Sequence, residues 1–286
     1  MAYEYFVHEG IILALFVINV MAFNLAFGYT GVIQLGHVAL IGFGAYSSAL
    51  LSKLLGINPW ISILFAGIMT CIFGVLMSIP ALRLKKDYLS LVMLGLNFIL
   101  YAVARNWISL TRGALGLPGL SRLVKDNNLT LIIAIALVAL TYISIKILTN
   151  SRIGKIMQGI RDDELSVSVL GKNPAIYKAI SLGISGFFAG IAGAFYVHYI
   201  TFLDPSIFEL GYLILLLSAL NLGGLGHLEG SILGAFIVSF FSVAVRFTGL
   251  PADILGPMRD IIYASILIAI LVYWPRGLFG KVNLND

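Results

Sequence analysis

The chain has 286 residues, of which 60% are hydrophobic and only 11% are charged, and its mean hydropathy is +1.01. A soluble domain is about a quarter charged and less than half apolar, so the composition excludes an ordinary soluble protein and indicates an all-α polytopic membrane protein. A spanning helix takes about 20 apolar residues, so the length allows roughly 8–10 transmembrane helices in one domain covering 1–286. The formal charge of +5 is interpreted as loop lysines and arginines that set the topology, not as a nucleic-acid-binding surface.

The first half of the chain contains four apolar segments of spanning length. Glycines break the first of them at 28–31. The second is rich in small residues, which suits a central helix surrounded by protein because small side chains let helix backbones approach closely. These four expected spans are 10–27, 32–55, 59–82 and 88–104.

The second half contains five more apolar segments. The connection 105–128 before them is rich in glycine, so we expect an irregular or partly re-entrant loop. Gly186 and Gly190 have GxxxG spacing and are followed by Gly193, which predicts close helix packing. A tight glycine-rich turn is expected at 223–230. The five expected spans are 129–148, 176–202, 207–222, 231–250 and 258–274.

The orientation in the membrane follows from lysines and arginines in the loops. Alternating loops put ten of them on the side of segment 151–174 and six on the other side. Because cytoplasmic loops carry the excess of positive charge, the bias places the N-terminus outside and the C-terminus inside. The basic residues of 105–128 run against this bias.

Segment 150–175 is the longest polar interruption in the chain. Within it, Ile153, Met157 and Ile160 recur at helical spacing and predict a short amphipathic helix. Asp162 or Asp163 can cap a second short helix, where an acid also suits the positive end of the helix dipole.

The second short helix of this segment has its own signals. Leu165, Val169 and Leu170 form its expected apolar side, Gly171 is placed for the C-cap, and Pro174 restarts a helix. Three adjacent acids, 162–164, fit poorly with anionic inner-leaflet lipids. The segment therefore fits docking to a protein better than lying on lipid headgroups.

Several kinds of chemistry lack their motifs. No G-x-x-x-x-G-K-[ST] loop occurs, so the chain does not bind ATP in that way. None of the thirteen acidic residues lies near the middle of an expected span, Asp260 and Glu209 being at ends, which counts against a proton-driven carrier. The single cysteine, Cys71, and the lack of metal-ligand spacing or an acid–histidine pair give little support to an enzyme.

Uncharged polar residues remain inside the expected spans. Each can make a helix–helix hydrogen bond, or together they can line a pathway for a small polar solute, and the sequence leaves both readings open. Metal binding by the histidines is disfavoured because no third ligand is near either one. These residues are Asn19, Asn24, Gln34, His37, Asn97, His198 and Asn221.

The tripeptide Leu-Gly-His occurs twice, at 35–37 and 225–227, each time at the start of a glycine-rich helix. An internal repeat is common in transporters. Three matching residues are explained equally well by chance.

Five motifs in order resemble one family over nearly the whole chain: the permease subunits of ABC importers for branched-chain amino acids, of the LivM type. The family's G-Y-x-G…S-L-G-H…G-x-G-A-Y pattern appears at 28–46 and its L-R-L-x-x-D-Y-L pattern at 82–89. Its S-x-x-G-R…A-I-R-D-D-E…G-x-N pattern appears at 151–173, L-G-G-x-G at 222–226 and P-R-G-L at 275–278.

The resemblance implies an ABC importer permease fold and a set of partners. These are a second permease subunit of the LivH type, two cytoplasmic ATPase subunits that hold ATP and magnesium, and an extracytoplasmic solute-binding protein. No cofactor would be bound by this chain itself, which would be a multi-pass protein of a prokaryotic cytoplasmic (inner) membrane, in contact with lipid. The residues expected to couple to the ATPases are Gly154, Lys155, Ile160, Arg161, Asp162, Asp163, Glu164, Gly171 and Asn173.

The solute pathway is assigned to a second set of residues: Asn24, Tyr29, Gln34, His37, Asn97, Thr111 and His198. Gln34 stands where the family usually has serine, Arg112 where the outer loop has glycine, and Lys155 where the coupling segment has arginine. The expected solute is an aliphatic, most of all a branched-chain, amino acid. Urea, short amides and other amino acids, which close relatives carry, are the alternative, and a secondary carrier or channel acting alone is the alternative from another class.

Overall fold

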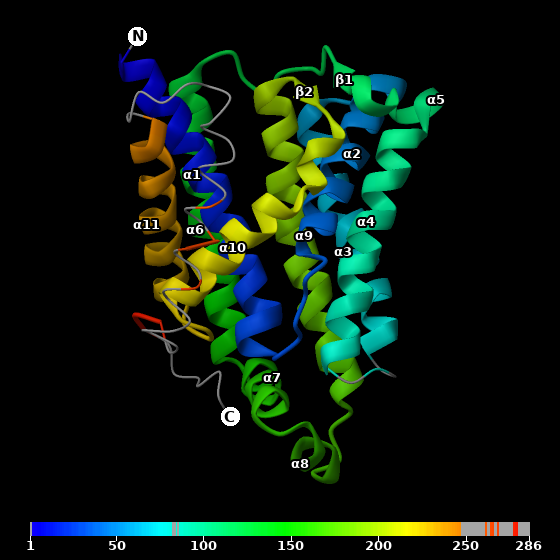
Figure 1. Cartoon of the computed structure of the whole chain (residues 1–286), viewed down its shortest axis with the longest axis vertical. Helices are drawn as coiled ribbons and strands as arrows, with labels where there is room; N and C mark the ends of the chain where they lie inside the picture. Colours follow the sequence, from blue (N-terminus) through cyan, green and yellow to red (C-terminus); the bar gives the residue numbers. More distant parts are fainter. Residues whose placement is uncertain are drawn as a thin grey trace.

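Helices dominate the computed structural model, which describes residues 2–81, 84, 86–246, 261, 264, 265, 268 and 277–279. Six helical segments there are long and apolar enough to cross a membrane, which confirms the all-α polytopic class. Figure 1 shows them as an upright bundle. They are α1 (Ala2–Asn24) with the π-helical turn η1 (Leu25–Tyr29), α2 (His37–Leu55), α3 (Pro59–Ala81), α4 (Lys86–Asn106), α6 (Asn127–Asn150) and α9 (Pro174–Ile200).

Two further apolar helices are shorter. The expected seventh span divides into a 3₁₀ turn, η3 (Pro205–Phe208), and α10 (Leu210–Gly223). With 14 residues α10 is about 21 Å long, less than the roughly 30 Å hydrocarbon core. The eighth span is α11 (Leu228–Arg246). Some predicted features lie wholly or largely outside the described residues. They are the expected ninth span, 258–274, with Asp260, and two of the basic loop residues, Arg83 and Lys85.

The break after α1 is the main irregularity in the bundle. As expected, the helix ends within 28–31, but α2 begins at His37 and not at position 32. Segment 30–36 is not helical and turns back into the bundle, where it rises from the lower end (Figure 1). Gly31 has a φ of +73°, and the Val32 and Gln34 side chains are buried. Non-helical backbone is tolerated at membrane depth only where protein or a cavity surrounds it.

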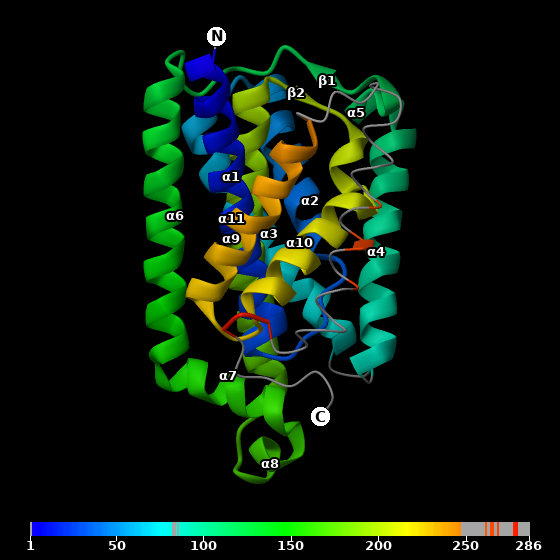
Figure 2. The same cartoon turned by 60° about the vertical axis from the view of Figure 1, so that its left-hand side comes forward.

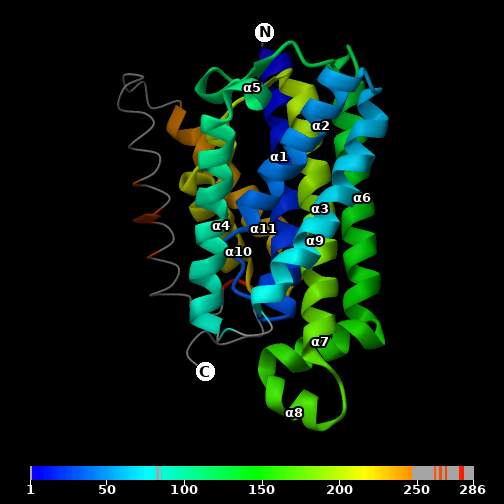
Figure 3. The ribbon, with the colours of Figure 1, turned by 90° about the vertical axis from the view of Figure 1, so that its right-hand side faces the viewer.

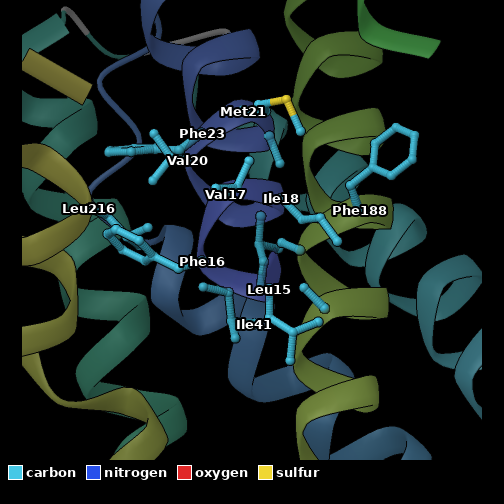
Figure 4. Packing of buried hydrophobic residues seen from close by; sticks show 14 of the residues in the cluster. Leu15, Phe16, Val17, Ile18, Val20, Met21, Phe23, Ile41, Phe188 and Leu216 are labelled. Carbon is cyan, nitrogen blue, oxygen red and sulfur yellow. The ribbon is translucent and has the colours of Figure 1, made fainter. Parts of the chain in front are cut away.

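The core forms around α1, which is apolar on all sides and therefore suited to a central position. Figure 4 shows its side chains, among them Phe16 and Ile18, between Phe188 of α9, Ile41 of α2 and Leu216 of α10. These residues belong to one buried hydrophobic cluster.

The glycines of α9 bring it close to its neighbours, as their spacing predicts. A Cβ added to Gly186 or Gly190 would meet Thr70 of α3 at 2.7 and 2.4 Å, and one added to Gly193 would meet the Ile41 carbonyl at 2.2 Å. Gly44 of α2 lies equally close to Gly190. Only glycine allows these backbones to touch.

The two ends of the bundle carry different structures. Segment 105–126 forms α5 (Ile108–Thr111), the 3₁₀ turn η2 (Gly113–Leu115) and β1 (Leu117–Pro118), which pairs antiparallel with β2 (Phe202–Leu203). Figure 2 shows this irregular loop staying at the end that carries the N-terminus, so the re-entrant alternative is wrong for it. The opposite end carries α7 (Arg152–Asp162) and α8 (Glu164–Val169), and α8 projects beyond the bundle (Figure 3).

Candidate functional site: the α7–α8 segment and the polar interior

Helix α7 is the predicted amphipathic helix. Ser151 caps it by accepting a hydrogen bond from the Gly154 amide at 3.3 Å. Met157 and Ile160 are fully buried, whereas Ile153 is partly exposed. A Cβ on Gly154 would lie 2.3 Å from the Leu148 carbonyl, so glycine is required where α7 turns back against the end of α6.

The N-cap of helix α8 is Asp163 and not Asp162. Its carboxylate accepts from the amides of Leu165 (3.0 Å) and Ser166 (3.3 Å). Hydrogen bonds from Ser166, through its hydroxyl and its amide, hold the pKa of the Asp163 carboxyl below its usual value, so the cap stays charged at neutral pH.

The end of the segment departs slightly from the prediction. Leu170 is the C-cap of α8, and Gly171 follows it with a φ of +76°. Asn173 caps α9 by accepting from the Ala175 amide at 3.1 Å, and Pro174 is the first residue of that helix, as expected.

The expected apolar side of α8 is uncovered. Leu165, Val169 and Leu170 are 76%, 86% and 78% exposed, and only Val167 packs inward. A cluster of large apolar side chains on a projecting tip marks an interaction site. Asp162, which precedes α8, is exposed too, and so is Lys155 on α7.

Arg161 points inward, toward the α1–α2 break. Its Nη1 donates to the Gly28 carbonyl at 3.0 Å, its Nε pairs with Asp162 at 2.8 Å, and its backbone touches Gly31 closely. Glu164 pairs with Lys178 of α9 at 2.6 Å, which ties α8 to the bundle. The predicted coupling residues therefore fall into two groups, one facing solvent and one joining the segment to the transmembrane helices.

A cavity of about 260 Å³ lies at this joint. It is lined by segment 30–33 together with Leu89, Ile160, Glu164 and Lys178. The joint is therefore incompletely packed.

Three of the predicted pathway residues, Asn24, Thr111 and His198, have structural roles. Asn24 holds the turn before α11: its Oδ1 accepts from the Gly226 amide (3.0 Å) and its Nδ2 donates to the His227 carbonyl (3.0 Å). Thr111 is the last residue of α5, and its hydroxyl donates hydrogen bonds to the Ala104 and Trp107 carbonyls at 2.7 and 2.8 Å.

His198 joins three helices near the end of the bundle that carries the N-terminus. Its Nδ1 donates to the Ser121 carbonyl at 2.7 Å, so its Nε2 accepts from the hydroxyls of Ser48 and Ser62 at 2.9 and 3.2 Å. Helix–helix hydrogen bonding is the observed role of this residue. The described residues contain no group that could hold a metal ion.

The remaining pathway residues are buried, and three of the four have polar atoms without a partner among the described residues. Within the described part of the chain, Gln34 Nε2, Asn97 Oδ1 and both ring nitrogens of His37 have no hydrogen-bond partner. His37 stacks on Phe23, with the ring centroids 4.9 Å apart. Tyr29 is buried and lies beside Thr149. Unsatisfied buried polar atoms are rare, so Gln34, His37 and Asn97 remain candidates for the pathway.

The sequence interpretation missed a second polar cluster around Asn19, Tyr212 and Glu209. Asn19 was identifiable only as one polar residue in an apolar span. Glu209, expected at a span end, lies deeper: Phe208 precedes it, and the Phe208 carbonyl accepts from Asn97, near the centre of α4, at 2.9 Å. The cause is η3, which enters the bundle before α10 begins.

A model of the family described as "Branched-chain amino acid transport system / permease component" matches residues 10–271. The chain belongs to this family. The match covers most of the chain and confirms the resemblance found in the motifs. The protein is accordingly a permease subunit of the ABC importer class, and its family is one of transporters.

Named relatives of this permease include both LivM and LivH proteins. LivM of Escherichia coli K12, a high-affinity branched-chain amino acid transport system permease protein, is 26% identical over 92% of this chain and 67% of that protein. A probable LivM of Methanocaldococcus jannaschii is 20% identical over 93% of this chain and 91% of that protein. LivH of Escherichia coli K12 is 22% identical, with the same coverage.

Among solved structures, this permease is similar to a chain of PsaBC from Streptococcus pneumoniae in complex with Fab. The TM-score is 0.49 and the identity 19%, over 94% of this permease and 91% of that chain. Relatives of both the LivM and the LivH type fit an importer whose membrane part is a pair of such permeases.

Proposed function

We propose that this permease forms, with a second permease subunit, the translocation pathway for branched-chain amino acids in a prokaryotic cytoplasmic membrane. Separate ATPase subunits bind α7 and α8 and drive import. An extracytoplasmic binding protein delivers the solute at the opposite end, which carries β1 and β2. The solute follows from what the LivM and LivH relatives carry; the coupling follows from the α7–α8 segment.

The exposed tip of α8 is the observation that carries this proposal. Helix α8 projects beyond the bundle (Figure 3), and the side chains of Leu165, Val169 and Leu170 are more than three-quarters exposed. Lipid is a poor partner for this tip because Asp162 and Asp163, beside it, would face anionic headgroups. An apolar groove on an ATPase, with charged residues at its rim, matches the tip in both respects.

The inner contacts give the docked segment a route to the membrane helices. Arg161 reaches the end of η1, and Glu164 reaches Lys178 of α9. Movement of α7 and α8 with the ATPases would therefore move the α1–α2 break and α9 together. The break contains Gln34 and borders His37, two of the candidate pathway residues.

A substitution pair tests the docking. Leu165→Asp places a charge on the α8 tip, and Leu115→Asp makes the same change at a residue of similar exposure, 74%, at the other end. We expect Leu165→Asp to release the ATPases during size-exclusion chromatography and to abolish ATP-dependent L-leucine uptake, with Leu115→Asp retaining the ATPases. Full ATPase retention by Leu165→Asp would refute the docking site.

A further inference from the structure

A cavity of about 480 Å³ lies between α1, α9, α10 and η3. This volume is within the range of small-molecule sites. It runs from Glu9, near the outer end of α1, to Asn19 and Ile41 deeper in the bundle. It is separate from the α7–α8 joint and from the break at 30–36.

One side chain in this cavity lacks a partner that a ligand could supply. Asn19 is 3% exposed, and its Nδ2 donates to the Tyr212 hydroxyl at 3.2 Å. Its Oδ1 accepts no hydrogen bond from any residue that the structure describes. Asn19 and Tyr212 both line the cavity. A buried amide oxygen left without a donor is destabilising, so the site favours a ligand that donates a hydrogen bond there.

The charge of the cavity has one sign. Glu9, Asp204 and Glu209 line it, and among its described lining residues there is no lysine or arginine. Asp204 also caps η3 through the Ser206 amide at 2.7 Å. Glu209 follows Phe208, whose carbonyl is bound by Asn97 near the centre of α4, so Glu209 lies at mid-depth along the bundle, and its side chain, although exposed, lines the cavity. A carboxylate at that depth is costly and points to a cationic partner.

Most of the remaining lining residues are apolar. Ile12, Leu15, Ile41 and Leu215 contribute hydrocarbon side chains, and Tyr196, Ser206 and Ser239 add hydroxyl groups. The lining thus combines acidic, hydrogen-bond-accepting groups with apolar side chains, a combination that suits a small amphipathic cation.

We propose that this cavity binds an aliphatic amino acid by its ammonium group, with Asn19 Oδ1 and the Glu209 carboxylate as acceptors and the apolar wall around the side chain. The inference rests on the proposed function and adds to it a binding site within one permease subunit. It makes Asn19 and Glu209 specificity-determining residues.

The test is direct binding of radiolabelled L-leucine to the complete transporter in nanodiscs, without the binding protein. Two competitors each keep one end of leucine: 3-methylbutylammonium lacks the carboxylate, and 4-methylpentanoate lacks the ammonium. We expect the amine to compete and the acid not to. We expect Glu209→Gln and Asn19→Leu each to weaken leucine binding about tenfold or more, the loss of one charge-assisted hydrogen bond.

The control is Asp126→Asn, which removes one outer acid that does not line the cavity and keeps the cap of α6. Because Asn19 is buried, the assembly of the Asn19→Leu permease with the ATPases is checked first. If that variant does not assemble, Glu209→Gln tests the cavity independently, because Glu209 is exposed. Equal competition by the acid, unchanged binding in Glu209→Gln, or no saturable binding to the unsubstituted transporter would overturn the inference. ATP-driven leucine uptake is measured separately and tests the proposed function. If the transporter imports leucine but Glu209→Gln leaves leucine binding unchanged, only the binding site in the cavity is overturned.

Discussion

Replacing Arg161 by glutamine tests whether α7 transmits ATPase movement to the membrane helices. The guanidinium donates to the Gly28 carbonyl at 3.0 Å, and its side chain is 17% exposed. A hydrogen bond from a charged group contributes about 1.5–3 kcal/mol, a factor of roughly 10–150 in an equilibrium constant. If the bond is made in only one of two transport states, its loss shifts their equilibrium by up to that factor.

The assay follows ATP hydrolysis and L-leucine uptake in the same proteoliposomes. Because Arg161 points inward, we expect Arg161→Gln to keep the ATPases bound and to lower the leucine imported per ATP by about tenfold or more. Lys125→Gln removes one exposed positive charge at the opposite end of the bundle and is the control, with near-normal coupling. An unchanged ratio in Arg161→Gln would refute transmission through Gly28, and loss of the ATPases would make Arg161 a docking residue instead.

Two further predictions concern packing. Gly154→Ala should lower the free energy of unfolding by about 1–3 kcal/mol, because the added Cβ meets the Leu148 carbonyl. Gly95→Ala is the control: a Cβ added there has no neighbour within 4 Å, so the free energy of unfolding should stay unchanged or rise by about 0.5–1 kcal/mol. Thermal unfolding in detergent compares the two, and equal melting temperatures would contradict the packing at Gly154. Asn24→Ala should cost about 1–3 kcal/mol for each buried partner it leaves unpaired, the Gly226 amide first; a melting temperature within error of the parent would remove Asn24 from the turn.

The coupling segment could be predicted closely because its signals are local. Ser151, Asp163 and Asn173 are helix caps whose partners lie two or three residues away, and Met157 and Ile160 follow the helical period. What the sequence could not show is that Arg161 turns inward to Gly28, since that contact joins positions 133 residues apart.

The pathway was harder to predict because burial decides it. Asn24, His198 and Asn19 all read as one polar residue in an apolar span, yet the first two are satisfied by the turn before α11 and by three neighbouring chain segments. Asn19 is left with a free acceptor beside a cavity. The entry of η3 into the bundle was equally hidden, because 207–222 is mostly apolar and resembles a full span.

ATP-dependent uptake of L-leucine distinguishes an ABC importer permease from a carrier that acts alone. Proteoliposomes would contain either this permease alone or the complete transporter with its second permease, ATPases and binding protein. We expect leucine to accumulate only with the complete transporter and only when ATP is present. Leucine accumulation by the lone chain, driven by an ion gradient without ATP, would contradict it.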